Sequence, residues 1–343
     1  MRYDRHAVLR VLTALVALLA VARAGAAPVV LHFATAAPDG TAWARLFRTM
    51  GRELEANSRG EIASKWYFGG IAGSETEMLD RMHRGQLDVV MSGGMMCMKL
   101  SPSMRVLRVL GLFQSRDEAS YALGRLRPTI DAEMAQAGYR NIGEAVLGSD
   151  MLFTRAPVTS MAELRATRFW YWDLDDAMRE QLKALGVPAI GMPVENAERA
   201  YEDHRIDGFL AVPTAALAFQ WTVASKYLSE LRLGALPGCM IMTNRAWDQL
   251  SVDARNVVTV AAATFQARLE QLGRAQDEQL LGGLLAKQGL RKLPVPAGFA
   301  SDFFEAARRV RENLRDKLVP GALIDRVVGW VADFRAEHSR TGH

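Results

Sequence analysis

The fold class is decided by the stretch Ile62-Ala-Ser-Lys-Trp-Tyr-Phe68, Gly69-Gly-Ile-Ala-Gly-Ser74 and the residues that follow it up to Met91. The first part favours a strand and the second a loop. Ser74, with Glu77 three residues later, is a capping box for a helix over 75–84. The apolar run 87–91 is typical of another buried strand. A strand, a helix and a strand in this order predict a mainly parallel α/β sheet.

The same alternation continues on both sides of this stretch. Residues 29–34 form an apolar run that ends at the turn Pro38-Asp39-Gly40, and 41–57 have apolar residues at helical spacing. Further strands are expected at 167–172, 189–193, 206–211 and 240–244, and further helices at 175–185, 195–204, 253–288, 299–318 and 322–337. Two α/β lobes joined by crossing strands leave a cleft at the carboxyl ends of their sheets, which is where ligands bind in this class.

The amino terminus has the pattern of a secretory signal peptide, from Met1 to about Ala26. Arg2, Arg5 and Arg10 precede the apolar run 11–22, and Ala24-Gly25-Ala26 offers small residues for cleavage. The run is shorter than the roughly 20 residues of a membrane span, so we expect a free periplasmic protein. The whole chain has a formal net charge of +4, and most of it lies in this segment. A near-neutral mature chain gives no reason to expect a nucleic-acid partner.

Cysteine and histidine usage predicts neither a metal site nor a cofactor. Cys97 and Cys239 are the only cysteines, and two cysteines so far apart do not define a disulfide framework. Two buried free thiols are the simpler expectation, and a disulfide is the alternative in an oxidising compartment. The six histidines have no metal-ligand spacing. The chain also lacks a Gly-x-Ser-x-Gly motif and a nucleophile–histidine pair, so an enzyme is not expected.

Several motifs together resemble the solute-binding proteins of TRAP transporters, the DctP-type family. The matching segments occur in the family's order: Phe33–Gly40 with Trp43, Gly69–Met78, Arg84–Asp88, Glu163–Phe169, Gly186–Pro193, Ile206–Gly208 and Thr243–Trp247. The resemblance implies a two-lobed periplasmic-binding-protein fold with a central cleft and a long hinge-spanning helix. We expect lobe I at 27–152 plus about 240–285, and lobe II at 153–239 plus about 286–343.

Three positions depart from the family's pattern of polar solute contacts. Where the family has an arginine that clamps the solute carboxylate, this chain has Trp170. Charge-assisted hydrogen bonds from an arginine contribute about 1.5–3 kcal/mol each, and an indole does not replace them. Asp150 stands where many members have a basic or polar residue. Phe209 stands near a position where many members are polar. These exchanges indicate a solute that is not a small organic acid.

The remaining candidates for the cleft are apolar or soft side chains. Ser92, Gly93, Met95 and Met96 follow the third strand of the first lobe, where the family contacts its solute. In the second lobe, Trp172 and Trp221 add aromatic surface. Each of these side chains has an alternative place in the core, because methionines and aromatic residues fill cores more often than pockets.

Arg168 could replace the family arginine that binds the solute carboxylate. It has the same strand parity as Trp170, so the two Cα atoms would lie about 6.6 Å apart on one face. Arg168 could then hold a carboxylate while Trp170 stacks on the solute. The preferred hypothesis is a receptor for a hydrophobic or amphipathic solute, and an ordinary carboxylate receptor is the alternative. A sensory binding protein would use the same cleft.

The resemblance also implies the partners. TRAP permease subunits in the membrane receive the solute from the closed receptor. Relatives that lack the clamping arginine suggest a helical-repeat periplasmic partner as well.

Overall fold

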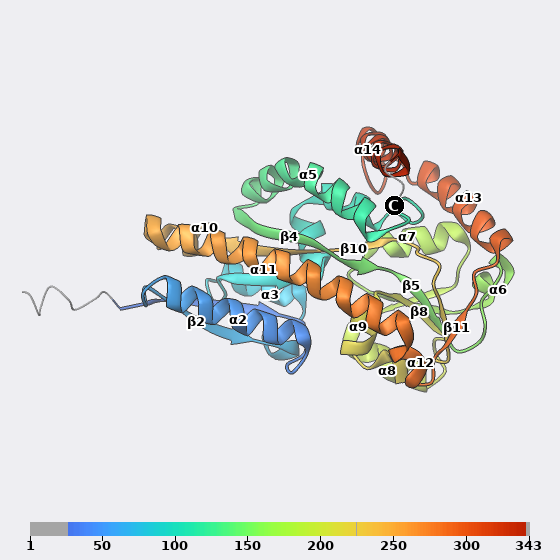
Figure 1. Cartoon of the computed structure of the whole chain (residues 1–343), viewed down its shortest axis with the longest axis horizontal. Coiled ribbons are helices and arrows are strands. Elements are labelled where there is room, and N and C mark those ends of the chain that lie inside the picture. The colour runs from blue at the N-terminus through green and yellow to red at the C-terminus, as the bar shows by residue number, and fades with distance from the viewer. Residues whose placement is uncertain (1–26, 224, 341–343) are drawn as a thin grey trace, which may run out of the picture.

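The structure is a computed structural model that describes residues 27–340 except Ala224. The expected signal peptide, at 1–26, lies outside the described residues. Two sheets form the centres of two lobes (Figure 1). None of the helices in the described part of the chain is long and apolar enough to span a membrane.

The first sheet has the strand order β2-β1-β3-β10-β4. Its strands are β1 Val29–Thr35, β2 Ile62–Tyr67, β3 Val89–Ser92, β4 Tyr139–Ser149 and β10 Ala235–Thr243. Strand β1 is parallel to β2 and β3, whereas the returning strand β10 is antiparallel to β3 and β4. The sequence pattern therefore identified the parallel half of this sheet correctly.

The second sheet has the strand order β11-β9-β5-β8-β6-β7. Its strands are β5 Met151–Thr154, β6 Phe169–Trp172, β7 Ala189–Met192, β8 Gly208–Ala211, β9 Tyr227–Ser229 and β11 Arg291–Leu293. The chain crosses between the lobes from β4 to β5, through Asp150, and again from β9 to β10. These crossings form the hinge.

Helices cover both sheets. They are α2 Ala42–Asn57, α3 Glu75–His83, α4 Met95–Leu100, α5 Arg116–Gln136, α6 Met161–Ala166, α7 Asp176–Leu185, α8 Val194–Glu202, α9 Pro213–Ala218, α10 Asn244–Asp248, α11 Val252–Gln279, α12 Leu285–Lys287, α13 Ala297–Asn313 and α14 Gly321–Arg340. Shorter helical turns are η1 Gly69–Ala72, η2 Pro102–Arg108, η3 Trp221–Val223 and η4 Leu280–Leu284. The predicted capping box is confirmed, since Ser74 and Glu77 cap α3 reciprocally.

The long helix α11 runs along both lobes, from α10 to α12 (Figure 1). Its first half packs on α2 and on the first sheet through Ala254, Val258 and Phe265. The predicted helix over 253–288 is interrupted at Gly283, whose φ of 138° is not helical. Helix α11 begins at Val252, close to the predicted start at 253, but it ends at Gln279, well before the predicted end at 288.

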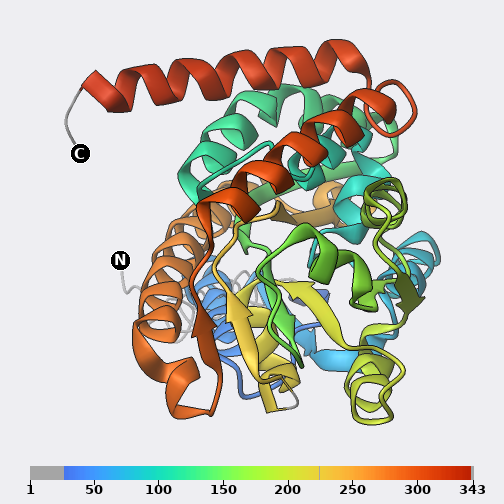
Figure 2. The same ribbon diagram turned by 90° about the vertical axis from the view of Figure 1, so that its right-hand side faces the viewer.

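The C-terminal helix α14 packs on α5 of the first lobe, as Figure 2 shows for the red helix. Its apolar residues Leu323, Ile324, Val327 and Val331 belong to the core beneath α5. This differs from the expected lobe II segment at 286–343, of which α13 packs on α7 of the second lobe. The reason is that the apolar face of α14 packs on α5 and η2, both of which belong to the first lobe.

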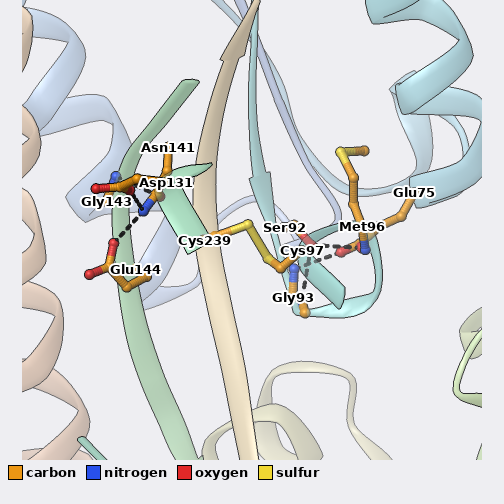
Figure 3. The surroundings of a disulfide bond; sticks show 11 residues. Glu75, Ser92, Gly93, Met96, Cys97, Asp131, Asn141, Gly143, Glu144 and Cys239 are labelled. Atoms are coloured by element: carbon orange, nitrogen blue, oxygen red, sulfur yellow. Dashed lines mark hydrogen bonds between the residues drawn. A yellow bond between two sulfur atoms is a disulfide. The ribbon is translucent and has the colours of Figure 1, made fainter. Parts of the chain in front are cut away.

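A disulfide joins Cys97 and Cys239, with their Cα atoms 5.9 Å apart (Figure 3). The expectation of two free thiols was wrong. In the antiparallel pairing of β10 with β3, Cys239 lies opposite Ser92, and α4 begins just after β3. The fold therefore brings together two cysteines separated by 142 positions in the sequence.

Candidate functional site

A cavity of about 120 Å³, here called the inner cavity, lies between the first sheet, α2, α11 and α9 of the second lobe. Much of its wall is aromatic or aliphatic. These side chains are Trp43, Phe47, Leu147, Phe219, Leu236, Met240, Phe265 and Leu269. Chain segments far apart in sequence thus meet around one apolar space.

The inner cavity has few polar groups in its wall. Among the described residues that line it there is no lysine, arginine or histidine, and the polar ones are Thr35, Ser92, Glu144 and Gln266. Glu144 accepts a hydrogen bond from Asn141 Nδ2 at 2.7 Å and pairs with Arg127 of α5 at 3.2 Å. Successive side chains of a strand point to opposite faces, so the carboxylate of Glu144 lies on the α5 face, away from Ala145 and Leu147.

Glu75 organises the loop at the end of β3. Its buried carboxylate accepts hydrogen bonds from Ser92 Oγ at 2.7 Å and from the backbone N–H groups of Gly93 and Met96, each at 2.6 Å (Figure 3). Burial nevertheless raises the pKa of the Glu75 carboxyl. Gly94 completes the turn, since its φ is 117° and a Cβ there would lie 2.5 Å from the Pro237 oxygen. At many helix amino termini, backbone N–H groups bind the carboxylate of a ligand. Here the N–H groups of Gly93 and Met96 already donate to the carboxylate of Glu75.

Trp170 lies in the core of the second lobe and not in the wall of the inner cavity. Its side chain is 4% exposed, and its Nε1–H donates to the Met192 carbonyl at 3.0 Å. Phe209 and Trp221 belong to the same core. Trp221 stacks on Phe219 with ring centroids 5.1 Å apart, and Phe219 reaches the cavity. The aromatic wall at 219–221 is thus formed by Phe219, with Trp221 behind it.

The other predicted aromatic and methionine positions lie between the lobes. Ser92 and Gly93 line the inner cavity, and a Cβ on Gly93 would lie 3.9 Å from the ring of Trp172. Trp172 therefore packs against the first lobe from β6. Met95 and Met96 line a different interlobe groove of about 330 Å³, together with Asp173 and Asp175 of the second lobe.

Asp150 is held in a buried ion pair at the hinge. Arg108 Nη1 donates to the Asp150 carboxylate, while its Nε and Nη2 donate to Asp175 Oδ2 at 3.1 and 2.7 Å. Arg108 and both acids are almost fully buried. Burial raises the pKa of the Asp150 carboxyl, and Arg108 opposes that rise. One guanidinium thus ties η2, the β4–β5 crossing and the start of α7 together.

The Arg168 side chain lies on the outer surface, where it is already hydrogen-bonded. Its Nε donates to Asp207 Oδ2 at 2.7 Å, and its Nη2 donates to the His204 carbonyl at 2.8 Å. The bonds to Asp207 raise the pKa of the Arg168 guanidinium. The residue precedes β6, which begins at Phe169, so the strand parity used to place it beside Trp170 does not apply.

Sequence reasoning missed the contribution of three helices to the site. Gln266 and Leu269 come from α11, Phe47 and Trp43 from α2, and Ala215 from α9. The apolar spacing of 43 and 47 predicted a helix face but gave no sign that this face borders a cavity. Arg108 was also missed, because its partners Asp150 and Asp175 are far away in the sequence and no local pattern points to them.

The comparisons with known proteins identify the family. Residues 33–317 match the bacterial extracellular solute-binding proteins of family 7, DctP. The chain belongs to this family. As a DctP protein, it is 23% identical over 228 residues to the 2,3-diketo-L-gulonate-binding periplasmic protein YiaO of Escherichia coli K12, which covers 66% of this chain and 69% of YiaO.

Solved structures show the same fold. A TRAP periplasmic solute-binding protein of Haemophilus influenzae with bound L-gulonate superposes with a TM-score of 0.80 at 16% identity, over 89% of this chain and 99% of that one. DctP7 of Bordetella pertussis, a receptor binding pyroglutamic acid, gives a TM-score of 0.80 at 18% identity, over 87% and 99%. The two-lobed fold predicted from the sequence is therefore confirmed.

Proposed function

We propose that this DctP protein is the periplasmic receptor of a TRAP transporter for a small apolar or amphipathic solute. The observation that carries the proposal is the apolar wall of the inner cavity, which no basic side chain of the described residues lines. The solute enters between the lobes, and the closed receptor delivers it to the membrane permease subunits.

Burial of apolar surface supplies the binding energy in this account. Each Å² of apolar surface removed from water contributes about 25 cal/mol, so a ring or short alkyl chain can drive closure. Engineered apolar cavities of about 150 Å³ hold a benzene-sized molecule. Phe219 comes from the second lobe and Phe47 from the first, so a solute between them contacts both lobes only in the closed state.

An organic acid is the alternative solute, because the structural neighbours named above bind L-gulonate and pyroglutamic acid. Such a solute needs a positive partner. Arg168 is bound to Asp207 on the outer surface, and Arg108 is shared by Asp150 and Asp175 in the hinge. Neither guanidinium lines the inner cavity, so the geometry favours the apolar solute.

Two further predictions concern partners. A sensory role would use the same cleft, and solute uptake by cells with and without the permease separates it from transport. The helical-repeat periplasmic partner stays a prediction.

A binding panel tests the proposal. Calorimetry of the mature protein with pentyl methyl ether, L-gulonate and pyroglutamate should show binding of the ether alone. Phe219→Ala should weaken that binding about tenfold or more, because it removes one wall of the cavity. Val223→Ala is the matched control, since Val223 is 80% exposed on the neighbouring turn. Binding of gulonate or pyroglutamate with no binding of the ether would refute the proposal.

A further inference from the structure

Gln266 is the polar residue of the inner cavity whose side chain has no hydrogen-bond partner among the residues that the structure describes. The three other polar residues of the wall are engaged. Glu144 and Ser92 hydrogen-bond as described above, and the Thr35 hydroxyl accepts from the Ala37 N–H at 3.2 Å. Gln266 is only partly buried, and neither polar atom of its amide is closed off from solvent. The amide is thus open to a solute molecule that occupies the cavity.

The Gln266 amide lies beside Gly143 of β4, on which α11 packs. A Cβ atom on Gly143 would stand 3.6 Å from Gln266 Oε1 and 2.4 Å from Cε of Met240. Gly143 and Met240 also line the inner cavity, so the amide oxygen lies within the wall that β4 and α11 form together. Gly143 has no side chain that could cover the amide on this side.

On α11, Gln266 stands within an apolar face. Phe265 precedes it and Leu269 follows one turn later, and both also line the inner cavity. Residues three and four apart lie side by side on a helix, so these apolar side chains flank the amide. An apolar residue at 266 would complete the face, whereas an amide there gains only from a hydrogen-bonding partner. A solute in the cavity is in the position to supply that partner.

The surroundings of the Gln266 amide favour a neutral partner. No basic side chain of the described residues lines the inner cavity, and Arg268, two residues along α11, pairs with Glu53 of α2 at 2.6 Å. The carboxylate of Glu144 lies on the α5 face, where it pairs with Arg127. A carboxylate or an ammonium group that entered the apolar space would lose its hydration and find no opposite charge.

We propose that Gln266 is the specificity-determining residue of the inner cavity and that it binds one neutral hydrogen-bonding group of the solute. The amide carries both a donor and an acceptor, so a solute hydroxyl donates to its oxygen or accepts from its NH₂, whichever way the amide is turned. The Trp43 indole in the same wall can only donate. The solute class is therefore a small apolar body with a neutral group that donates a hydrogen bond. This inference rests on the proposed function and names the solute class.

The experiment compares two neutral probes of the same length. Hexanol donates a hydrogen bond, whereas the oxygen of pentyl methyl ether carries a methyl group and only accepts. Calorimetry of the mature wild-type protein should show that hexanol binds about fivefold more tightly than the ether, as one neutral hydrogen bond allows. Hexanoate and hexylamine should bind more weakly than hexanol, because the cavity offers neither charge a partner.

Two variants assign the preference to Gln266. Gln266→Leu removes the amide and keeps a similar volume, and leucine favours a helix as strongly as glutamine does, so α11 should be retained. In this variant the affinity for hexanol should fall to that for the ether, and the ether should still bind. Gln271→Leu, at an exposed position of the same helix, is the matched control and should leave the preference intact.

Three results would overturn the inference: a preference for hexanol that survives in Gln266→Leu, no preference in the wild type, or tighter binding of hexanoate than of hexanol. Wild-type binding of the two neutral probes separates this inference from the proposed function. If the ether binds as tightly as hexanol, only the role of Gln266 is wrong. If neither neutral probe binds, the proposed apolar solute is wrong as well.

Discussion

Trp170 and Trp221 meet edge to face, with ring centroids 4.8 Å apart and an angle of 66° between the rings. Trp221 in turn stacks on Phe219, which forms part of the cavity wall. The position that resembles the family's carboxylate clamp therefore supports the wall from behind in this chain. It contributes to the shape of the site through packing and not through a bond to the solute.

Trp170→Phe should lower the free energy of unfolding by about 1–3 kcal/mol. The smaller ring leaves part of the core unfilled, and the hydrogen bond to the Met192 carbonyl is lost. Urea unfolding measures the change. Ether binding should fall less than in Phe219→Ala, since Trp170 does not line the cavity. An affinity loss in Trp170→Phe larger than in Phe219→Ala would contradict the structural role.

The disulfide should stabilise the first lobe. Replacing both Cys97 and Cys239 by alanine should lower the free energy of unfolding by about 2–5 kcal/mol, because the cross-link restricts the unfolded chain. Unfolding in urea with and without dithiothreitol measures this. The wild type should lose stability when reduced, and the double variant should not respond to the reductant. A wild type indifferent to dithiothreitol would mean that the bond does not form.

Arg108→Met should be strongly destabilising at neutral pH, by about 3–5 kcal/mol, because it leaves Asp150 and Asp175 buried without their partner. Burial already raises the pKa of the Asp150 carboxyl above its ordinary range. Removing the guanidinium raises it further. A raised folded pKa means that stability is present below the unfolded pKa and is lost as pH rises through the folded one. The defect should therefore shrink as the pH is lowered.

Arg168→Met is the matched control for the hinge arginine. Its ion pair with Asp207 is half exposed, so the variant should be nearly as stable as the wild type across the same pH range. Thermal unfolding at several pH values compares the two. A pH-independent defect in Arg108→Met would refute the account of the buried acids.

Arg168→Gln should also leave the binding of every probe unchanged within about twofold, because a surface substitution away from a site has only a small effect. The side chain is held by Asp207 and by the His204 carbonyl, outside the cavity. Calorimetry with pentyl methyl ether and with L-gulonate checks this. If gulonate binds the wild type and not this variant, Arg168 is the clamp and the alternative solute is correct.

Local patterns predicted most elements of the fold, and long-range contacts explain what they missed. The capping box at Ser74 and the alternation of strands and helices depend on neighbours in sequence, and they were confirmed. Helix α5 was missed, since Pro128 interrupts its pattern and its apolar face is weakly periodic. The disulfide was missed because the pairing of β10 with β3 brings Cys239 near Cys97 only in three dimensions.

The candidate site was predicted in part. Ser92 and Gly93 line the inner cavity because they end a central strand, which the sequence shows. Trp170 and Phe209 turned out to lie in the second-lobe core, since a strand presents alternate residues to either face and the sequence does not say which face is open.

The most direct test of the central claim is mass spectrometry of the molecule extracted from the mature protein after purification from its own periplasm. The account predicts a small apolar or amphipathic molecule. A sugar acid or a dicarboxylate in its place would contradict the apolar solute and would point to an anion site that the inner cavity does not provide.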